Sequence, residues 1–220
     1  VISQIEEGTI PANSDNEKKQ AIAETRALRA FYYWWICDNF GDAPLIKEPT
    51  TELPSCSPRK DIYDFIISEL KAAIPDLSEE VGGKQYGRMN KWAAECLLAN
   101  VYLNAEVYTG TPQWQACIDE CDKIISSGKC ELAENYKDNF KAQGQENCKE
   151  ILFSIPSDYT YGGAVYFQMF SWGGQMQKAR NLKSTPWGEG TACGITQFID
   201  TYDTLDNRLP DTWLMGQQYS

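Results

Sequence analysis

Apolar residues recur at helical spacing in four stretches of this chain, with glycine or proline near the ends of each stretch. The first stretch covers residues 17–39, where Leu28, Phe31 and Trp35 follow one another at intervals of three and four. This spacing predicts a helix. Because its run FYYWWIC is apolar on nearly every side, we expect the helix to be buried all round. Glycine readily takes the left-handed conformation that closes a helix, so the helix should end at Gly41.

Three further helices are predicted in the same way. Ser57-Pro58 is typical of an N-cap followed by proline at the first helical position, and the helix should end at Pro75. A third helix covers residues 90–107, and a fourth should begin at Thr111-Pro112 and end at Gly128. The last two are joined by a short turn, so we expect them to lie antiparallel.

The third helix contains the pattern Leu98-Ala99-x-x-Tyr102, which resembles the front of a tetratricopeptide repeat. A generic helical hairpin explains the pattern equally well. Two stacked helix pairs of the repeat type would form a short superhelix. Asp42 lies in the turn before Pro44, where turn formation and capping explain it better than a functional role.

The character of the chain changes after Gly128. Residues 151–155, ILFSI, predict a short buried strand, and a short helix carrying Phe198 and Ile199 is predicted further on. Residues 157–194 are rich in glycine and aromatic residues, which favours an ordered loop over a disordered one. We therefore predict a mostly α fold with tetratricopeptide-like helix pairs over residues 1–130. Residues 131–220 should form a loop-rich lobe of the same domain, with little β structure.

Composition excludes several classes of function. The 220 residues include no histidine, which excludes Ser-His-Asp and Cys-His nucleophile systems and histidine-based zinc sites. The net charge of −11 argues against nucleic-acid binding. No apolar run approaches the ~20 residues of a membrane span, and no cofactor is implied. The acidic residues Asp200, Asp203 and Asp206 lack the spacing of an EF-hand, so we expect a solvated surface and no metal site.

The eight cysteines include no CxxC pair. Cys96, Cys117 and Cys121 lie on apolar helical stripes and are predicted to be buried thiols. The sequence also allows a disulfide between Cys130 and Cys148 if the protein lies in an oxidising compartment.

Six segments resemble, in order and spacing, the motifs of the SusD/RagB family. They are RALRAFYYWWICDNFGDAPLI (26–46), SPRKDIYDFIISELKAAIPDL (57–77), GRMNKWAAECLLANVYLNAEVY (87–108), WQACIDECDKIISSGKCEL (114–132), ENCKEILFSI (146–155) and TACGITQFIDTYDTLDNRL (191–209). The resemblance implies an outer-membrane surface lipoprotein of the Bacteroidetes that captures glycans for a TonB-dependent SusC-like transporter. Some members take peptides instead. We expect the N-terminal lipid anchor and the C-terminal portion of the family to lie outside this chain.

Sugars present flat apolar faces ringed by hydroxyls, so a carbohydrate site needs exposed rings for stacking and polar side chains for hydrogen bonds. Residues 157–194 supply both. An alternative is that the rings only pin the loop to the helices. The predicted stacking rings are Trp172, Tyr161, Trp187, Tyr159 and Tyr166, and the predicted polar partners are Gln175, Arg180 and Asn181.

Two other functions are weighed against glycan binding. A protein-interaction scaffold would offer the helix pairs to a peptide or to the transporter. A glycoside hydrolase needs a pair of carboxyl groups, one with a raised pKa. We find no carboxylate in an apolar segment where burial would raise its pKa, so we do not expect an enzyme.

Overall fold

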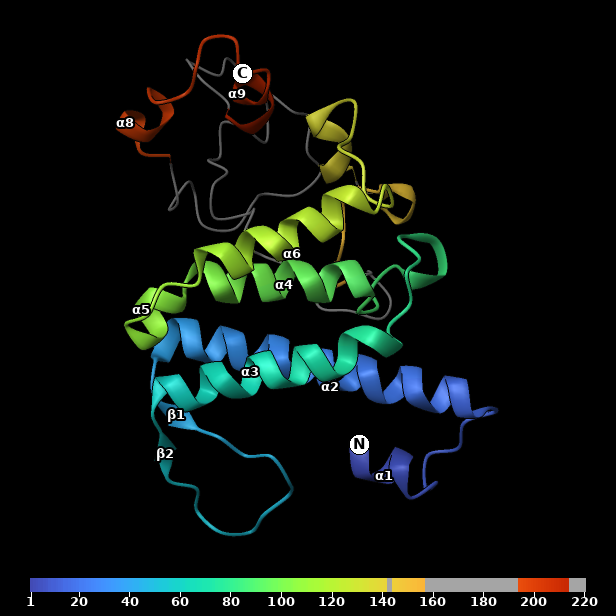
Figure 1. Cartoon of the computed structure of the whole chain (residues 1–220). Helices are drawn as coiled ribbons and strands as arrows, with labels where there is room; N and C mark the ends of the chain where they lie inside the picture. The colour runs from blue at the N-terminus through green and yellow to red at the C-terminus, as the bar shows by residue number, and fades with distance from the viewer. Residues whose placement is uncertain (142–143, 157–193, 214–220) are drawn as a thin grey trace, which may run out of the picture. The chain divides into compact units, whose positions relative to one another are not determined.

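The computed structural model describes residues 1–141, 144–156 and 194–213 (Figure 1). The chain forms two compact units, which we describe separately. Unit 1 consists of residues 1–132 and 143–154, and unit 2 consists of residues 133–142 and 155–220. In the described parts of the chain, no helix combines the length and the apolar character needed to cross a membrane.

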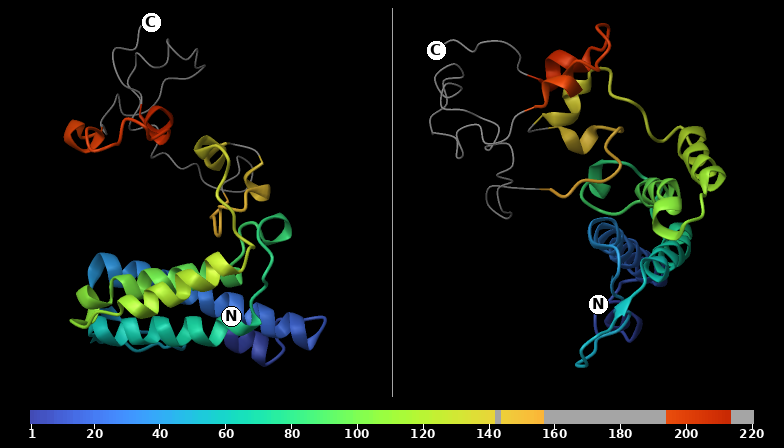
Figure 2. Two further views of the ribbon diagram at one scale, coloured as in Figure 1. Left: turned by 45° about the horizontal axis from the view of Figure 1, so that its top comes forward. Right: turned by 90° about the vertical axis from the view of Figure 1, so that its left-hand side faces the viewer.

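Unit 1 is built from antiparallel helix pairs. In Figures 1 and 2, α3 lies beside α2 and α6 lies beside α4, while α3 also contacts α4 and α5. The mostly α fold predicted from the sequence is therefore confirmed. The helices are α1 (Ile2–Glu6), α2 (Asp15–Phe40), α3 (Arg59–Ala73), α4 (Lys91–Leu103), α5 (Ala105–Thr109) and α6 (Trp114–Ser126), with 3-10 turns η1 (Ile74–Asp76), η2 (Gly83–Gln85) and η4 (Gln145–Asn147).

The first helix pair is joined through the two-residue strands β1 (Ala43–Pro44) and β2 (Cys56–Ser57). They pair antiparallel, with Ala43 opposite Ser57 and Pro44 opposite Cys56. This is the only sheet in the part of the chain that the structure describes. It brings the end of α2 close to the start of α3 although a long loop separates them.

Helix α2 confirms the predicted first helix and its end at Gly41, which has φ 74°. Its buried face carries the small residues Ala23, Ala27, Ala30 and Cys37, which allow the backbone of a neighbouring helix to approach closely. The prediction that the helix is buried all round is wrong. A helix is buried all round only when neighbours cover every side, and one side of α2 carries exposed aromatic rings.

The start of α3 corrects the prediction of a Ser57 cap. The helix begins at Arg59 after Pro58, and no cap hydrogen bond comes from within the local sequence. Asp42 supplies it instead, because its Oδ1 accepts a hydrogen bond from the Arg59 backbone N–H at 2.7 Å. The capping role expected for Asp42 is therefore confirmed, but on a helix that begins 17 residues later.

The second helix pair differs from prediction in its boundaries. Asn90 caps α4 by accepting from the Ala93 N–H at 2.9 Å, as a polar N-cap should. The single helix predicted over 90–107 is divided at Asn104 into α4 and α5. Helix α6 begins at Trp114 rather than at Pro112, and the short turn before it contains Gly110 with φ 77°.

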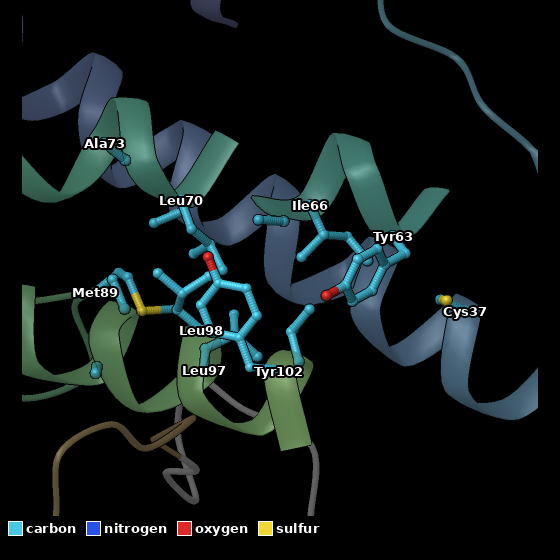
Figure 3. Close-up of a cluster of buried hydrophobic side chains, with 14 of the residues drawn as sticks. Cys37, Tyr63, Ile66, Leu70, Ala73, Met89, Leu97, Leu98 and Tyr102 are labelled. Carbon is cyan, nitrogen blue, oxygen red and sulfur yellow. The ribbon is translucent and has the colours of Figure 1, made fainter. Parts of the chain in front are cut away.

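The core of unit 1 lies where α3 meets α4. Ile66 and Leu70 of α3 are fully buried and pack in one cluster with Leu98 of α4 and with Met89, which precedes α4 (Figure 3). Burial of an aliphatic side chain of this size stabilises a fold by roughly 1.5–3 kcal/mol. This cluster therefore holds the two helix pairs together.

Residues 151–155 do not form the predicted strand, and no strand pairs with them in the described residues. The segment instead packs on the helices. The Leu152 carbonyl accepts a hydrogen bond from Asn90 Nδ2 at 2.9 Å, and the Phe153 ring meets Phe31 edge-on at 5.6 Å. The prediction of burial is correct only in part, because residues 151–154 are half-buried against the helices and Ile155 is 64% exposed.

Unit 2 contains, among its described residues, η3 (Tyr136–Phe140), α8 (Thr196–Ile199) and α9 (Arg208–Thr212). Helix α8 confirms the short helix predicted around Phe198. Lys137 and Asp211 form an ion pair at 2.9 Å between η3 and α9. Asp206 accepts from Arg208 Nε at 2.9 Å, so this acidic residue stabilises a turn.

Candidate functional site

The eight residues predicted to contact a ligand all lie outside the described residues. They are Tyr159, Tyr161, Tyr166, Trp172, Gln175, Arg180, Asn181 and Trp187. Their roles therefore stay predictions, and the candidate site is built from surfaces that the structure describes.

The first such surface is on α2. We call it the ring face, and it consists of Tyr32, Trp35, Ile36, Asn39 and Phe40 around a hollow of about 370 Å³. The residues recur at i, i+3, i+4, i+7 and i+8, so they share one side of the helix. Tyr32 is 55% exposed, Trp35 53% and Phe40 77%. Such exposure of large rings on one side of a helix is typical of a contact surface.

The rings of this face are held by a ring beneath them. Phe31 meets Tyr32 edge-on at 5.7 Å and lies 6.1 Å from Trp35, and Phe31 is itself packed against Phe153. Asn39 donates from Nδ2 to the Trp35 carbonyl at 2.8 Å, which fixes the amide beside the rings. The ring face therefore offers ordered aromatic surface with one polar group, a combination that suits stacking against a flat apolar ligand face.

A second hollow, of about 560 Å³, lies between α3 and the segment that follows β1. Its lining includes Lys47, Asp61, Phe65 and Ser68. The Lys47 ammonium lies 5.5 Å from the Phe65 ring centroid, and the ring is buried beneath it. This hollow is polar at its rim and offers little ring surface to a ligand.

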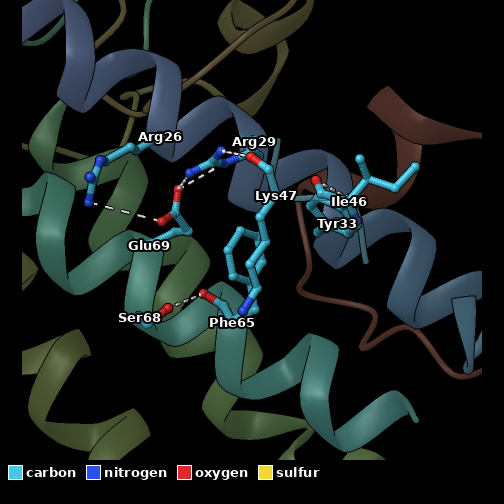
Figure 4. Close-up of polar contacts among 8 residues, drawn as sticks. All are labelled: Arg26, Arg29, Tyr33, Ile46, Lys47, Phe65, Ser68 and Glu69. Carbon is cyan, nitrogen blue, oxygen red and sulfur yellow. Dashed lines mark hydrogen bonds and ion pairs between the residues drawn. The ribbon is translucent and has the colours of Figure 1, made fainter. Parts of the chain in front are cut away.

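The wall of this second hollow is anchored to α2 (Figure 4). The Tyr33 hydroxyl accepts from the Ile46 N–H at 2.8 Å and donates to the Ile46 carbonyl at 2.9 Å. Arg29 Nη1 donates to the Lys47 carbonyl at 3.2 Å. The segment after β1 therefore has a fixed position beside the helix pair.

The ion pair between α2 and α3 was missed by sequence reasoning. Glu69 lies on the apolar side of α3 with its side chain 9% exposed, and both Nε and Nη2 of Arg29 donate to its Oε2. Arg26 Nη1 lies 4.0 Å from the other carboxylate oxygen. The charge of Glu69 is thus met by two guanidinium groups, which allows it to be buried.

Glu95 corrects the expectation that no carboxylate lies in an apolar segment. It lies in the run WAAECLLA of α4 and is 3% exposed, and burial raises its pKa despite the opposing effect of Lys123. Among the residues that the structure describes, its Oε2 has no hydrogen-bond partner. Glu95 lines neither of the two hollows described above.

The cysteines differ in part from prediction. Cys96, Cys117 and Cys121 are half-buried rather than buried, and burial raises the pKa of the Cys96 thiol. Cys130 is a free thiol, so the bridge to Cys148 is not formed. Across the described ranges, no group of three or more Cys, Asp or Glu side chains is arranged to hold a metal ion.

Comparison with known proteins agrees with this architecture. A SusD-like family model, described as "Starch-binding associating with outer membrane", matches residues 1–103. The starch-binding protein SusD of Bacteroides thetaiotaomicron is 34% identical over 160 residues, which cover 70% of this chain and 29% of that protein. The chain therefore belongs to the SusD/RagB family, as its motifs predicted.

Solved structures of other proteins resemble this chain in fold. A crystal structure with a xylogluco-oligosaccharide is 28% identical, with a TM-score of 0.63, over 72% of this chain and 32% of that one. A SusD superfamily protein from Bacteroides fragilis shares the fold over 95% of this chain and 46% of its own, with 20% identity and a TM-score of 0.74. The chain spans under a third of the length of the curated relatives it matches.

Proposed function

We propose that this protein binds glycans at the cell surface and passes them to a TonB-dependent SusC-like transporter. The observation that carries this proposal is kinship with a starch-binding protein at 34% identity. The relative crystallised with a xylogluco-oligosaccharide supports the same class of ligand. Attachment to the outer membrane through an N-terminal lipid anchor is part of this proposal, since the matching family model describes association with that membrane.

The mechanism proposed is capture without bond cleavage. Helix pairs of unit 1 serve as the scaffold, and aromatic rings stack on the apolar faces of sugar rings while polar groups bind the hydroxyls. Two sets of rings suit this role. One is the predicted set in residues 159–187, in the loop-rich lobe, and the other is the ring face of α2.

Calorimetric titration with xyloglucan and maltooligosaccharides tests the proposal. We expect binding by the native protein and at least a tenfold loss of affinity in Trp172→Ala/Trp187→Ala, because stacking rings carry much of such an interaction. Trp35→Ala tests the ring face. Leu53→Ala is the matched control, since Leu53 is 98% exposed and lies outside the ring face.

The possible outcomes separate the alternatives. Unchanged affinity in both tryptophan variants would show that the rings only support the fold. Binding of peptides in place of every glycan would favour the scaffold function, and release of reducing ends from polysaccharide would show an enzyme. Co-purification with a SusC-like transporter tests the transporter step.

A further inference from the structure

A third hollow of unit 1, of about 520 Å³, is lined by residues that lie before α4, after α6 and after η4. Its walls are residues 79–84, residues 128–129 and Lys149, which come from three separate parts of the sequence. The volume falls within the roughly 300–1,000 Å³ of ligand sites. We call it the lysine hollow, after Lys84, Lys129 and Lys149.

Two of the three wall segments of the lysine hollow contact each other. Gly82 has φ 70°, and a Cβ at this position would clash with the Glu146 carbonyl, so the two backbones are in direct contact. The Tyr86 hydroxyl hydrogen-bonds Gln145 Oε1 at 3.2 Å. Asn90 joins the same two segments through its bond to the Leu152 carbonyl. Lys84 and Lys149 are therefore carried on segments that contact each other directly.

Positive charge gathers in this hollow although the chain is acidic. Two acidic residues, Glu79 and Glu80, also line it. Glu79 is bonded to Lys91 Nζ at 2.6 Å, which lowers its pKa, with a smaller contribution from Lys129. The charge of Glu79 is therefore paired mainly with Lys91, which does not line the hollow.

The three lysines are exposed, and within the described residues only Lys149 forms an ion pair. Lys149 is bonded to Glu131 at 3.1 Å, and both side chains are more than half exposed. Lys84 and Lys129 have no ion pair within 4.0 Å in the described residues. The net charge of −11 weakens this positive charge little, because charges beyond about 8 Å are screened at physiological ionic strength.

We propose that the lysine hollow binds an acidic glycan, with Lys84 and Lys129 meeting carboxylate groups of uronic acids and Glu80 accepting hydrogen bonds from sugar hydroxyls. This inference rests on the proposed function and names its ligand class. Ammonium groups are compact point charges that bind anionic oxygens, whereas a neutral sugar offers no charge to meet them. Carboxylates in the wall favour a uronate, with one charge per sugar, over a more densely charged sulfated glycan.

Titration of the native protein and the Lys84→Gln/Lys129→Gln variant tests this assignment. The probes are oligogalacturonides, a sulfated oligosaccharide and a neutral xyloglucan oligosaccharide. We expect the double variant to bind oligogalacturonides about tenfold more weakly and the neutral probe unchanged, with the loss diminished at high salt. The sulfated probe should bind more weakly than the oligogalacturonide. Lys60→Gln is the matched control, since Lys60 is exposed on α3 and does not line the hollow.

Each outcome decides between the two proposals. Oligogalacturonide affinity that is unchanged in the double variant, or lowered equally by Lys60→Gln, overturns the lysine hollow as the site. Tighter binding of the sulfated probe overturns the choice of a uronate. If only the neutral probe binds, the acidic ligand class is wrong while glycan binding stands. If no glycan of any class binds, the proposed function fails as well.

Discussion

Replacing Glu69 by glutamine tests how the first helix pair is held together. The change keeps the shape of the side chain and removes its charge, so Arg26 and Arg29 lose their shared counter-ion. Breaking a fully buried ion pair costs about 3–5 kcal/mol, and an exposed pair contributes about 0–1 kcal/mol. Glu69 is 9% exposed, but the side chains of Arg29 and Arg26 are 26% and 33% exposed. We therefore expect the free energy of unfolding to fall by about 2 kcal/mol.

The measurement is urea unfolding followed by helical circular dichroism. Lys60→Gln serves as the control, because its pair with Asp64 lies on the same helix with both side chains more than half exposed. We expect that control to change stability by less than about 0.5 kcal/mol. In a double-mutant cycle, Arg29→Gln should offset part of the loss in Glu69→Gln, since one unpaired cation is then gone. A loss in Glu69→Gln no larger than in Lys60→Gln would refute this reasoning.

Three further predictions concern burial, capping and the core. Glu95→Gln should stabilise the protein by about 1 kcal/mol at pH 7, because burial raises the pKa of Glu95 and its charged form is disfavoured in the fold. That penalty is absent below the unfolded pKa near 4.5, grows as pH rises from there towards the folded pKa and is complete above it, so equal gains at pH 4 and pH 7 in urea unfolding would contradict it. Asp42→Ala should lower stability by about 1 kcal/mol through loss of the α3 cap, and Asp42→Asn, which keeps an acceptor, by less; equal losses in calorimetry would argue against capping. Leu70→Ala should cost about 2–5 kcal/mol because Leu70 is fully buried, and a loss below 1 kcal/mol in the same assay would mean that the site collapses around the smaller side chain.

Most helices of the fold could be predicted because the pattern that indicates a helix depends only on residues close together in the sequence. The periodic apolar residues of α2 and α3, and the glycine that ends α2, depend only on neighbours within a few residues. The candidate site was less predictable. An aromatic residue on a helix gives the same signal whether it is covered or exposed, so Tyr32 and Trp35 of the ring face were assigned to the interior.

The sequence by itself determined the helices, the mostly α class and the family, because spacing and motifs are properties of the chain alone. Only the tertiary structure decided which side of α2 stays exposed, that Asp42 caps a helix 17 residues away, and that Glu69 and Glu95 are buried. It also placed three lysines from distant segments around one hollow. The physical reason is that burial and charge pairing are set by neighbours in space, which local periodicity does not record.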